Sequence, residues 1–167
     1  CWAGRDMVAI MNEALELAPG LKVLEVGAGS GWHAATVAEV VAPSDAPRES
    51  WGHVWTIEIV PELAAMARRN VEANGFAERV TVLHGDGSLG YPPEAPYDRI
   101  LVTAAAPDLP RPLLDQLADG GVMLLPVGSI GFFQTLVRVR KRGGRLEMED
   151  LGGVSFVPLR GLYGHRL

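Results

Sequence analysis

Two hydrophobic patterns alternate along the chain. From Met7 to Leu17 the apolar residues recur every three or four positions as far as Pro19-Gly20, and this spacing predicts an amphipathic helix. The run KVLEVG at 22–27 is short and largely apolar, as in a buried strand, and helical spacing returns at 32–41. The chain therefore opens as helix, strand and helix.

The alternation continues to about residue 128. The further predicted elements are a strand at 53–59, a helix at 61–74, strands at 79–85 and 97–103, a short helix at 112–117 and a strand at 121–128. Strands that alternate with helices form a parallel sheet with helices on both faces.

The segment 134–159 breaks this alternation. It contains two strand-like runs around Gly143-Gly144 and no helical pattern, which predicts an antiparallel pair at one edge of the sheet. The polar segment 42–52 predicts a surface loop. We therefore expect one α/β domain, 1–167, with a doubly wound, mostly parallel seven-stranded sheet that ends in an antiparallel C-terminal strand pair.

Composition narrows the class of protein. The net charge of -5 gives no global positive field that would attract nucleic acid, so no nucleic-acid partner is expected. The single cysteine, Cys1, excludes an internal disulfide framework and a cysteine-based zinc site, so we expect no metal and a reducing, cytoplasmic location. No apolar run approaches the roughly 20 residues of a membrane span, and we expect a monomer with no membrane partner.

One local cluster of positive charge stands apart from this acidic background. It is expected to be a solvated turn between two strands, and it consists of Arg138, Arg140, Lys141, Arg142 and Arg145.

A glycine-rich turn follows the first predicted strand. Gly27, Gly29 and Gly31 can adopt positive φ angles and let a ligand approach the backbone, and the next helix offers free N–H groups. Ligands of open parallel sheets bind beyond the carboxyl ends of the strands, where this turn lies. Counted from Gly27, the spacing departs from the dinucleotide fingerprint G-x-G-x-x-G because Trp32 occupies the last position and His33 follows it, so a pyrophosphate ligand is disfavoured.

An acidic residue lies at the end of the next predicted strand, and another follows the strand after it. Glu58 can accept hydrogen bonds from ribose hydroxyls, and Asp86 can accept one from the exocyclic amine of adenine. Each feature alone has a simpler explanation, a tight connection or a helix cap. Together, at successive strand ends, they predict an adenosine-bearing ligand and the class I S-adenosylmethionine-dependent methyltransferase fold.

Longer segments carry a family resemblance. DMVAIMNEALEL, VLEVGAGSGWHAA, HGDGSLGYPPEAPYDRILVTAAAPDLPRPLLDQLADGGVMLLPVG, QTLVRV and VSFVPLRG closely resemble the protein-L-isoaspartate O-methyltransferase family, from about Met7 to Gly161. The resemblance implies S-adenosyl-L-methionine as the cofactor. The residues it implies for the cofactor site are Glu25, Gly27, Ala28, Gly29, Ser30, Gly31, His33, Glu58, Ile59, Gly85, Asp86, Gly87 and Thr103.

The family's reaction follows from the same resemblance. It transfers a methyl group to the α-carboxylate of isoaspartyl residues in aged peptides or proteins, and the ester then closes to a succinimide that reopens partly to normal aspartate. A carboxylate with a pKa of about 4 is ionised at neutral pH, so the attack needs no general base. Members of the family place a strand-end loop, here Thr103 to Pro107, near the methyl group and the acceptor.

The chain departs from the family at the acceptor site. Where members carry Ser-x-Pro-His-Met before the first helix, this chain has Ala3, Arg5 and Asp6 at the serine, proline and histidine positions. Arg5 can supply a charge-assisted hydrogen bond in place of the lost hydroxyl. After VPL, Arg160 replaces a threonine and is either a second carboxylate ligand or a solvated turn residue. The residues assigned to the acceptor side are Ala3, Arg5, Asp6, Thr103, Ala104 and Arg160.

Other readings stay open. The helices that precede the serine stretch in the family have no counterpart here, so an N-terminal helical segment is expected to be missing. A specific aspartyl residue could be the acceptor instead of isoaspartate. Ala3 and Asp6 also permit a cofactor-binding module without turnover, and a methyltransferase of the same fold that acts on a small molecule or RNA is a third alternative.

Overall fold

A computed structural model describes residues 5–166 of the chain. Strands and helices alternate through the first two thirds of it, as predicted. The α-helices are α1 (Arg5–Ala14), α2 (Trp32–Val41), α3 (Pro61–Ala73) and α4 (Arg111–Gln116). The strands are β1 (Lys22–Val26), β2 (His53–Glu58), β3 (Val80–His84), β4 (Tyr97–Val102), β5 (Leu117–Val127), β6 (Gln134–Arg142) and β7 (Arg145–Val154). Short 3-10 helices are η1 (Arg48–Ser50), η2 (Gly87–Leu89) and η3 (Pro92–Glu94).

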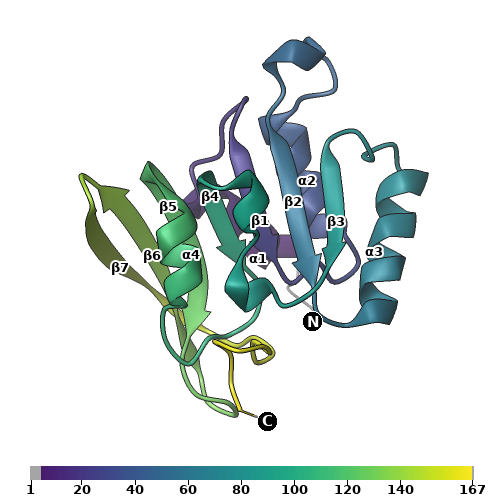
Figure 1. Cartoon of the computed structure of the whole chain (residues 1–167). Coiled ribbons are helices and arrows are strands. Elements are labelled where there is room, and N and C mark those ends of the chain that lie inside the picture. Colours follow the sequence, from purple (N-terminus) through teal and green to yellow (C-terminus); the bar gives the residue numbers. More distant parts are fainter. Residues whose placement is uncertain (1–4, 167) are drawn as a thin grey trace.

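The seven strands form one sheet in the order β3-β2-β1-β4-β5-β6-β7. The first five are parallel to their neighbours, whereas β6 runs antiparallel to β5 and β7 antiparallel to β6. Figure 1 shows the sheet with the β6–β7 hairpin at one edge and β3 beside α3 at the other. The predicted fold class, with its antiparallel C-terminal pair, is confirmed.

The two faces of the sheet carry separate cores. Along β1, Val23 faces α1 and α2, while Leu24 and Val26 face the opposite side, because side chains alternate along a strand. Helices α1, α2 and α3 cover the first face, and the single helix α4 covers part of the second (Figure 1). Burial on both faces explains why the sequences of the central parallel strands are largely apolar.

Three predicted boundaries move by a few residues. Helix α1 begins at Arg5 and ends at Ala14, so it starts and stops earlier than the predicted 7–17, and Glu16 after it has a positive φ of 55°. Strand β5 begins at Leu117 rather than at residue 121, with an irregularity in its pairing to β4. The loop 42–52 contains η1, and the indole of Trp51 donates to the carbonyl oxygens of Pro43 and Ala46.

The predicted solvated cluster is paired along the β6–β7 hairpin. Arg138 and Arg140 lie on the α1 side of β6, and both bind the carboxylate of Glu149, while Arg140 also binds Glu16. Lys141 donates to the carbonyl oxygens of Leu114 and Leu117 at the end of α4, at 3.0 Å each. Strand alternation therefore directs Arg138, Arg140 and Lys141 to partners just after α1, on β7 and near the end of α4, which the turn interpretation missed. Arg142 and Arg145 are exposed at the turn between β6 and β7, as expected.

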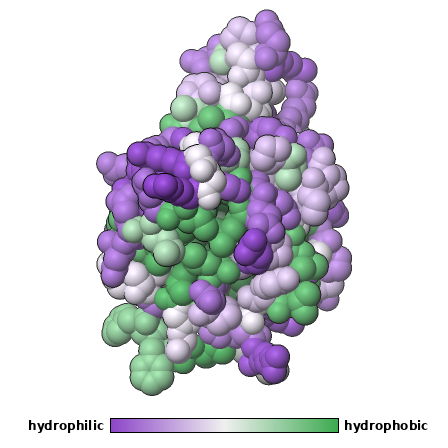
Figure 2. Space-filling view, turned by 60° about the vertical axis from the view of Figure 1, so that its left-hand side comes forward, coloured by the Kyte–Doolittle hydropathy of each residue, from purple (hydrophilic) through white to green (hydrophobic). Residues whose placement is uncertain are grey.

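Some of the exposed apolar residues lie in the β6–β7 hairpin and the β5–β6 loop. Figure 2 shows green surface in the middle of the face that includes β5, β6 and β7. The exposed large apolar residues of these segments are Ile130, Phe132, Phe133, Leu146, Met148 and Leu151. Among residues 5–166, no helix has the length and hydropathy needed to cross a membrane.

Candidate functional site

The glycine turn after β1 has the backbone that the sequence predicts. Gly27, Gly29 and Gly31 have φ angles of 98°, 52° and 87°, all in the region that favours glycine. Gly31 is the N-cap of α2, and the Gly27 N–H donates to the carbonyl oxygen of Ile57 at 2.8 Å. A Cβ on Gly29 would meet no atom within 4 Å, so the backbone there is open to a ligand.

Thr103, directly after β4, fixes this turn from the neighbouring strand. Its hydroxyl donates to the carbonyl oxygen of Gly27 at 2.8 Å. Its own N–H donates to the carbonyl oxygen of Val26 at 3.0 Å. The Thr103 side chain therefore joins the end of β4 to the glycine turn and stabilises the conformation of the turn.

Glu58 ends β2 beside the turn. Its buried carboxylate accepts from the Gly29 N–H through Oε1 at 3.0 Å and from the Val60 N–H through Oε2 at 3.1 Å. Each carboxylate oxygen can accept two hydrogen bonds, so both oxygens retain capacity for hydroxyl donors. This geometry suits recognition of a ribose diol.

A cavity of about 300 Å³ lies at the carboxyl ends of these strands. It brings together the turn after β1, the end of β2, the first residue of η2, the segment after β4 and the chain beyond β7. Its lining residues are Val26, Gly27, Gly29, Ile57, Glu58, Ile59, Val60, Leu63, Gly87, Thr103, Ala104, Val157, Pro158, Leu159 and Arg160. The structure thus assembles the predicted Gly27, Gly29, Glu58, Ile59, Gly87, Thr103, Ala104 and Arg160 around one space.

Glu25 lies outside this cavity lining, in a buried network on the α2 side of the sheet. The Thr56 hydroxyl donates to its Oε1 at 2.6 Å, while Oε2 has no hydrogen-bond partner within residues 5–166 and lies 4.0 Å from Nδ1 of His33. Burial, with a smaller contribution from the charge of Glu58, raises the pKa of Glu25 to about 8 against the lowering effect of Thr56. The carboxyl group is therefore largely protonated at neutral pH.

His33 belongs to the same network. Its Nε2 lies 2.8 Å from Oδ1 of Asn12, and burial lowers the pKa of the imidazole to about 4, so the ring is neutral at pH 7. Ala28 is also buried and, like His33, is absent from the cavity lining. Glu25, Ala28 and His33 thus lie outside the cavity lining, and their contact with the cofactor stays a prediction.

Asp86, two residues after β3, accepts hydrogen bonds from protein groups. Its Oδ1 accepts from the N–H and the hydroxyl of Ser88, at 3.0 and 2.6 Å, and its Oδ2 accepts from the Leu162 N–H at 2.8 Å. The carboxylate thus faces protein donors, while the adjacent Gly87 lines the cavity and Gly85 does not. Oδ2 keeps capacity for one further donor, so the expected hydrogen bond to adenine stays a prediction.

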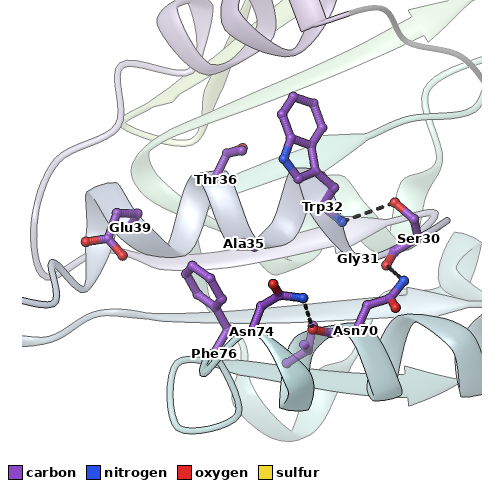
Figure 3. Close-up of a pocket in the computed structure, with 10 residues that line it drawn as sticks. Ser30, Gly31, Trp32, Ala35, Thr36, Glu39, Asn70, Asn74 and Phe76 are labelled. Atoms are coloured by element: carbon purple, nitrogen blue, oxygen red, sulfur yellow. Dashed lines mark hydrogen bonds between the residues drawn. The ribbon is translucent and has the colours of Figure 1, made fainter.

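Ser30 and Gly31 face a different hollow. A groove of about 460 Å³ lies between α2 and α3, and Figure 3 shows Trp32 and Phe76 beside it. Its amide groups are engaged with protein, since Asn70 donates to the Ser30 carbonyl oxygen at 2.9 Å and Asn74 to that of Asn70 at 2.8 Å. The groove is larger than the carboxyl-edge cavity, yet it lacks the convergent acceptors that Glu58 gives the latter.

Arg5 and Asp6, two of the residues expected to replace the family's acceptor stretch, are not brought to the cavity. Arg5 and Asp6 are exposed in the first turn of α1, and neither lines the cavity. Ala3 lies outside the described residues. Within residues 5–166 no group of three or more histidine, cysteine or acidic side chains is arranged to hold a metal ion.

Sequence reasoning missed the wall that the C-terminal segment supplies. Val157, Pro158 and Leu159 line the cavity, and Leu159 is buried. The sequence signal was the apolar FVPL run after β7, which we noted for its likeness to the family and not for its place in the cavity.

Comparison with known proteins gives consistent results. The family model for protein-L-isoaspartate(D-aspartate) O-methyltransferase matches residues 3–163. A protein-L-isoaspartate O-methyltransferase of Hyperthermus butylicus is 61% identical over 160 residues, which are 96% of this chain and 66% of the relative. One of Korarchaeum cryptofilum is 55% identical over 95% of this chain and 72% of its own length.

Solved structures share the fold. A protein-L-isoaspartate O-methyltransferase structure superposes with a TM-score of 0.85 at 29% identity, over 97% of this chain and 49% of that one. A structure from Plasmodium falciparum in complex with S-adenosyl-L-homocysteine has a TM-score of 0.77 at 24% identity, over 92% and 72% of the two chains. The chain thus spans about two thirds of the Hyperthermus relative and about half of the first solved structure.

Proposed function

Because this chain belongs to the protein-L-isoaspartate O-methyltransferase family, we propose that it transfers a methyl group from S-adenosyl-L-methionine to the α-carboxylate of isoaspartyl residues in damaged polypeptides. The observation that carries the proposal is the Glu58 carboxylate bonded to the Gly29 N–H at the rim of a cavity whose other wall holds Arg160. The cavity thus has an adenosine-type cradle on one side and a cation on the other.

The residues present fit the proposed cofactor. Gly29 leaves open space where a side chain would stand, and Glu58 retains acceptor capacity for the two ribose hydroxyls. Ile59, Val60 and Leu63 give the adjoining surface an apolar character suited to a planar base. When bound, S-adenosyl-L-methionine supplies an electrophilic methyl group on a positively charged sulfur.

The protein's own contribution to the reaction is orientation and exclusion of water. An acceptor carboxylate is ionised at neutral pH and needs no base, and the ionisable residues among those lining the cavity are Glu58 and Arg160. Apolar side chains around Ala104 and Leu159 displace water from the acceptor side, which strengthens charge interactions there.

Arg160 is the proposed ligand of the acceptor carboxylate. It is exposed and lies at the cavity wall directly after the buried Leu159. A guanidinium can hold a carboxylate through two parallel hydrogen bonds, which fixes the orientation of the attacking oxygen. Arg160 would thus carry the role that a hydroxyl residue carries in the family.

A methyl-transfer assay tests this function directly. The full chain is incubated with methyl-labelled S-adenosyl-L-methionine and a peptide that contains one isoaspartyl residue, and base-released labelled methanol is counted. The matched control peptide carries aspartate at the same position. Release from the isoaspartyl peptide alone supports the proposal.

Other outcomes identify the alternatives. Binding of S-adenosylhomocysteine by calorimetry without methanol release from either peptide would make the chain a binding module. Equal release from both peptides would point to an aspartyl acceptor and overturn the isoaspartyl assignment.

We also propose that the protein is a cytoplasmic monomer that does not bind nucleic acid. A single cysteine in the whole chain supports a reducing compartment. The pairing of Arg138 and Arg140 with Glu149 supports the absence of a nucleic-acid site. Size-exclusion chromatography with light scattering tests the oligomeric state.

A further inference from the structure

The loop between β5 and β6 carries exposed aromatic side chains. Phe132 and Phe133 are 76% and 86% exposed, and Ile130 before them is 45% exposed. Single exposed apolar residues are ordinary on protein surfaces, whereas two adjacent phenyl rings and an isoleucine in so short a loop form a patch. We call Ile130, Phe132 and Phe133 the loop patch. None of the three belongs to either core cluster of residues 5–166, so packing of the fold does not account for them.

The loop patch lies at the carboxyl edge of the sheet, on the side of the segment that walls the cavity. Figure 1 shows the light-green loop between β5 and β6 below the strands, as it does the yellow C-terminal segment. The N–H of Gly128, at the start of the loop, donates to the carbonyl oxygen of Ala106 at 2.9 Å, two residues after the cavity residue Ala104. The Ala105 N–H donates to the carbonyl oxygen of Val157 at 2.7 Å. The loop and the cavity wall thus pair with one short segment after β4.

The side chain of Gln134 joins the loop to this wall. It is buried, and its Nε2 donates to the carbonyl oxygen of Phe132 at 3.0 Å. Its Oε1 accepts from the Phe156 N–H at 2.8 Å. Phe156 directly precedes Val157, which lines the cavity and is half-exposed. A buried amide whose donor and acceptor are both engaged holds its neighbours in one arrangement, so the loop patch keeps a fixed place beside the Val157 end of the wall.

We propose that the loop patch binds apolar side chains that flank the isoaspartyl residue of an acceptor polypeptide. This inference rests on the proposed function and deepens it, since it adds a second contact to the acceptor carboxylate at Arg160. The wall from Arg160 to Val157 spans at most about 10 Å, because an extended chain advances about 3.3 Å per residue. An extended acceptor covers that length with about three residues. Side chains about two to four positions from the isoaspartate therefore reach the loop patch.

The size and charge of the loop patch favour a peptide segment over larger partners. Two phenylalanine side chains bury about 300–500 Å² at most, whereas a stable dimer buries about 800 Å² on each partner. Segments that lie on membranes combine apolar residues with lysine or arginine, and residues 128–134, GSIGFFQ, contain neither. An unfolded segment of a polypeptide exposes apolar side chains that a native fold buries. Because apolar contact is non-directional, the loop patch accepts many flanking sequences.

The experiment compares two isoaspartyl peptides of equal length and charge on the full chain. One carries leucine at positions two to four on both sides of the isoaspartate, and the other carries serine at the same positions. We expect KM to be about tenfold lower for the leucine peptide, as for burial of part of one aromatic ring. The turnover numbers should agree within about twofold, because the contact is the same in the ground state and the transition state.

Phe132→Ser combined with Phe133→Ser should remove this preference. In the double variant, KM for the leucine peptide should rise about tenfold. KM for the serine peptide and the calorimetric affinity for S-adenosylhomocysteine should stay within about twofold of the parent chain. Phe132→Leu combined with Phe133→Leu keeps the surface apolar and should retain the preference.

The matched control removes two exposed apolar side chains outside the cavity. Leu146→Ser combined with Met148→Ser changes residues of β7 that are both exposed and that do not line the cavity. It should leave the preference for the leucine peptide unchanged. A loss of preference as large as in the variant of Phe132 and Phe133 would reveal a general effect of surface polarity and overturn the assignment.

Fluorescence anisotropy of the two peptides, each carrying the same dye, provides a readout that needs no turnover. With saturating S-adenosylhomocysteine, the parent chain should bind the leucine peptide about tenfold more tightly than the serine peptide, and the serine double variant should bind both equally. Equal affinities of the parent chain for the two peptides would overturn the proposal.

Two further measurements identify other partners of the loop patch. A dimer mass of the parent chain in light scattering that becomes a monomer mass in the serine double variant would assign the loop patch to a second copy of the chain. Cosedimentation with phosphatidylcholine vesicles that is lost in the same variant would assign it to a lipid surface. Either result, with no preference for the leucine peptide, would overturn the acceptor assignment.

The two proposals can fail separately. If the parent chain transfers no methyl group to either isoaspartyl peptide, the proposed function fails, and the anisotropy measurement still decides whether Phe132 and Phe133 bind an apolar polypeptide.

Discussion

The hydroxyl oxygen of Thr103 lies 2.8 Å from the carbonyl oxygen of Gly27, and a Cβ placed on Gly27 would stand 2.5 Å from that same hydroxyl oxygen. The first contact joins the end of β4 to the turn after β1. The second shows that the turn has no room for a side chain on this side. Glycine is therefore required at position 27 for two reasons, its φ of 98° and the close approach of Thr103.

Gly27→Ala should destabilise the fold by about 2 kcal/mol or more, because it adds backbone strain to a collision. Gly75→Ala is the matched control, since Gly75 has a φ of +78° and nothing within 4 Å of its Cβ position. Urea unfolding gives the loss of stability in each variant, and the difference between the two losses is the cost of the collision with Thr103. Equal losses of stability in the two variants would show that the Thr103 side chain moves aside without a measurable energetic cost.

Glu58→Gln should weaken S-adenosylhomocysteine binding by about 1–3 kcal/mol, measured by calorimetry. The amide NH₂ of glutamine must face either the Gly29 N–H or the Val60 N–H, and two donors cannot bond to each other. The substitution therefore breaks one of these hydrogen bonds and removes an acceptor for the ribose hydroxyls. Glu62→Gln, an exposed change in the first turn of α3, should leave the affinity unchanged. An unaltered affinity in Glu58→Gln would exclude Glu58 from the site.

Glu25→Gln should change how stability depends on pH. Burial raises the pKa of Glu25 from 4.5 to about 8, so between these values the folded chain keeps a proton that the unfolded chain has lost. Stability contributed by this group therefore falls as pH rises through that window and is level above it. The variant should lack this fall, and urea midpoints at several pH values would reveal it.

The titration of His33 limits the pH range in which the effect of Glu25 on stability can be seen alone. Burial lowers its pKa from 6.5 to about 4, so the unfolded chain binds the extra proton and the contribution of His33 to stability rises with pH across that interval. From about pH 6.5 to 8 only Glu25 of the two changes its contribution. A wild-type slope there that persists in Glu25→Gln would contradict the assignment.

Arg99→Met should destabilise the chain by about 1–3 kcal/mol. Its guanidinium donates to the carbonyl oxygens of Leu15 and Glu16, at 2.6 and 3.1 Å, just beyond the end of α1. Both acceptors would lose a charged partner near the negative end of the helix dipole. The control is Arg111→Met, whose exposed side chain pairs only with Asp115 and should cost little in thermal unfolding.

The strands of the sheet could be predicted because the residue patterns that mark them lie within short stretches of the chain. The apolar run before Gly27, the glutamate at the end of β2 and the pair Gly143-Gly144 each mark an element through neighbours in the chain. Gly29 and Glu58 could be assigned to one site because carboxyl ends of parallel strands meet at one edge.

Residues whose partners are distant in the chain could not be placed this way. The hydrogen bond from Leu162 to Asp86 joins distant parts of the chain, and the basic residues of β6 bind acids just after α1 and on β7. His33 and Glu25 face the buried side of the turn, which the glycine pattern does not reveal. The composition of a segment indicates its element, whereas the partner of a polar side chain depends on the assembled fold.

The distance along the chain between Asp86 and Leu162, 76 residues, also orders events during synthesis. A growing polypeptide that has reached Thr103 already contains the turn after β1, Glu58 and the residue that clamps them. The wall with Arg160 emerges later, on the order of several seconds at ordinary elongation rates. The cavity therefore gains its last wall only when the C-terminal residues have been made.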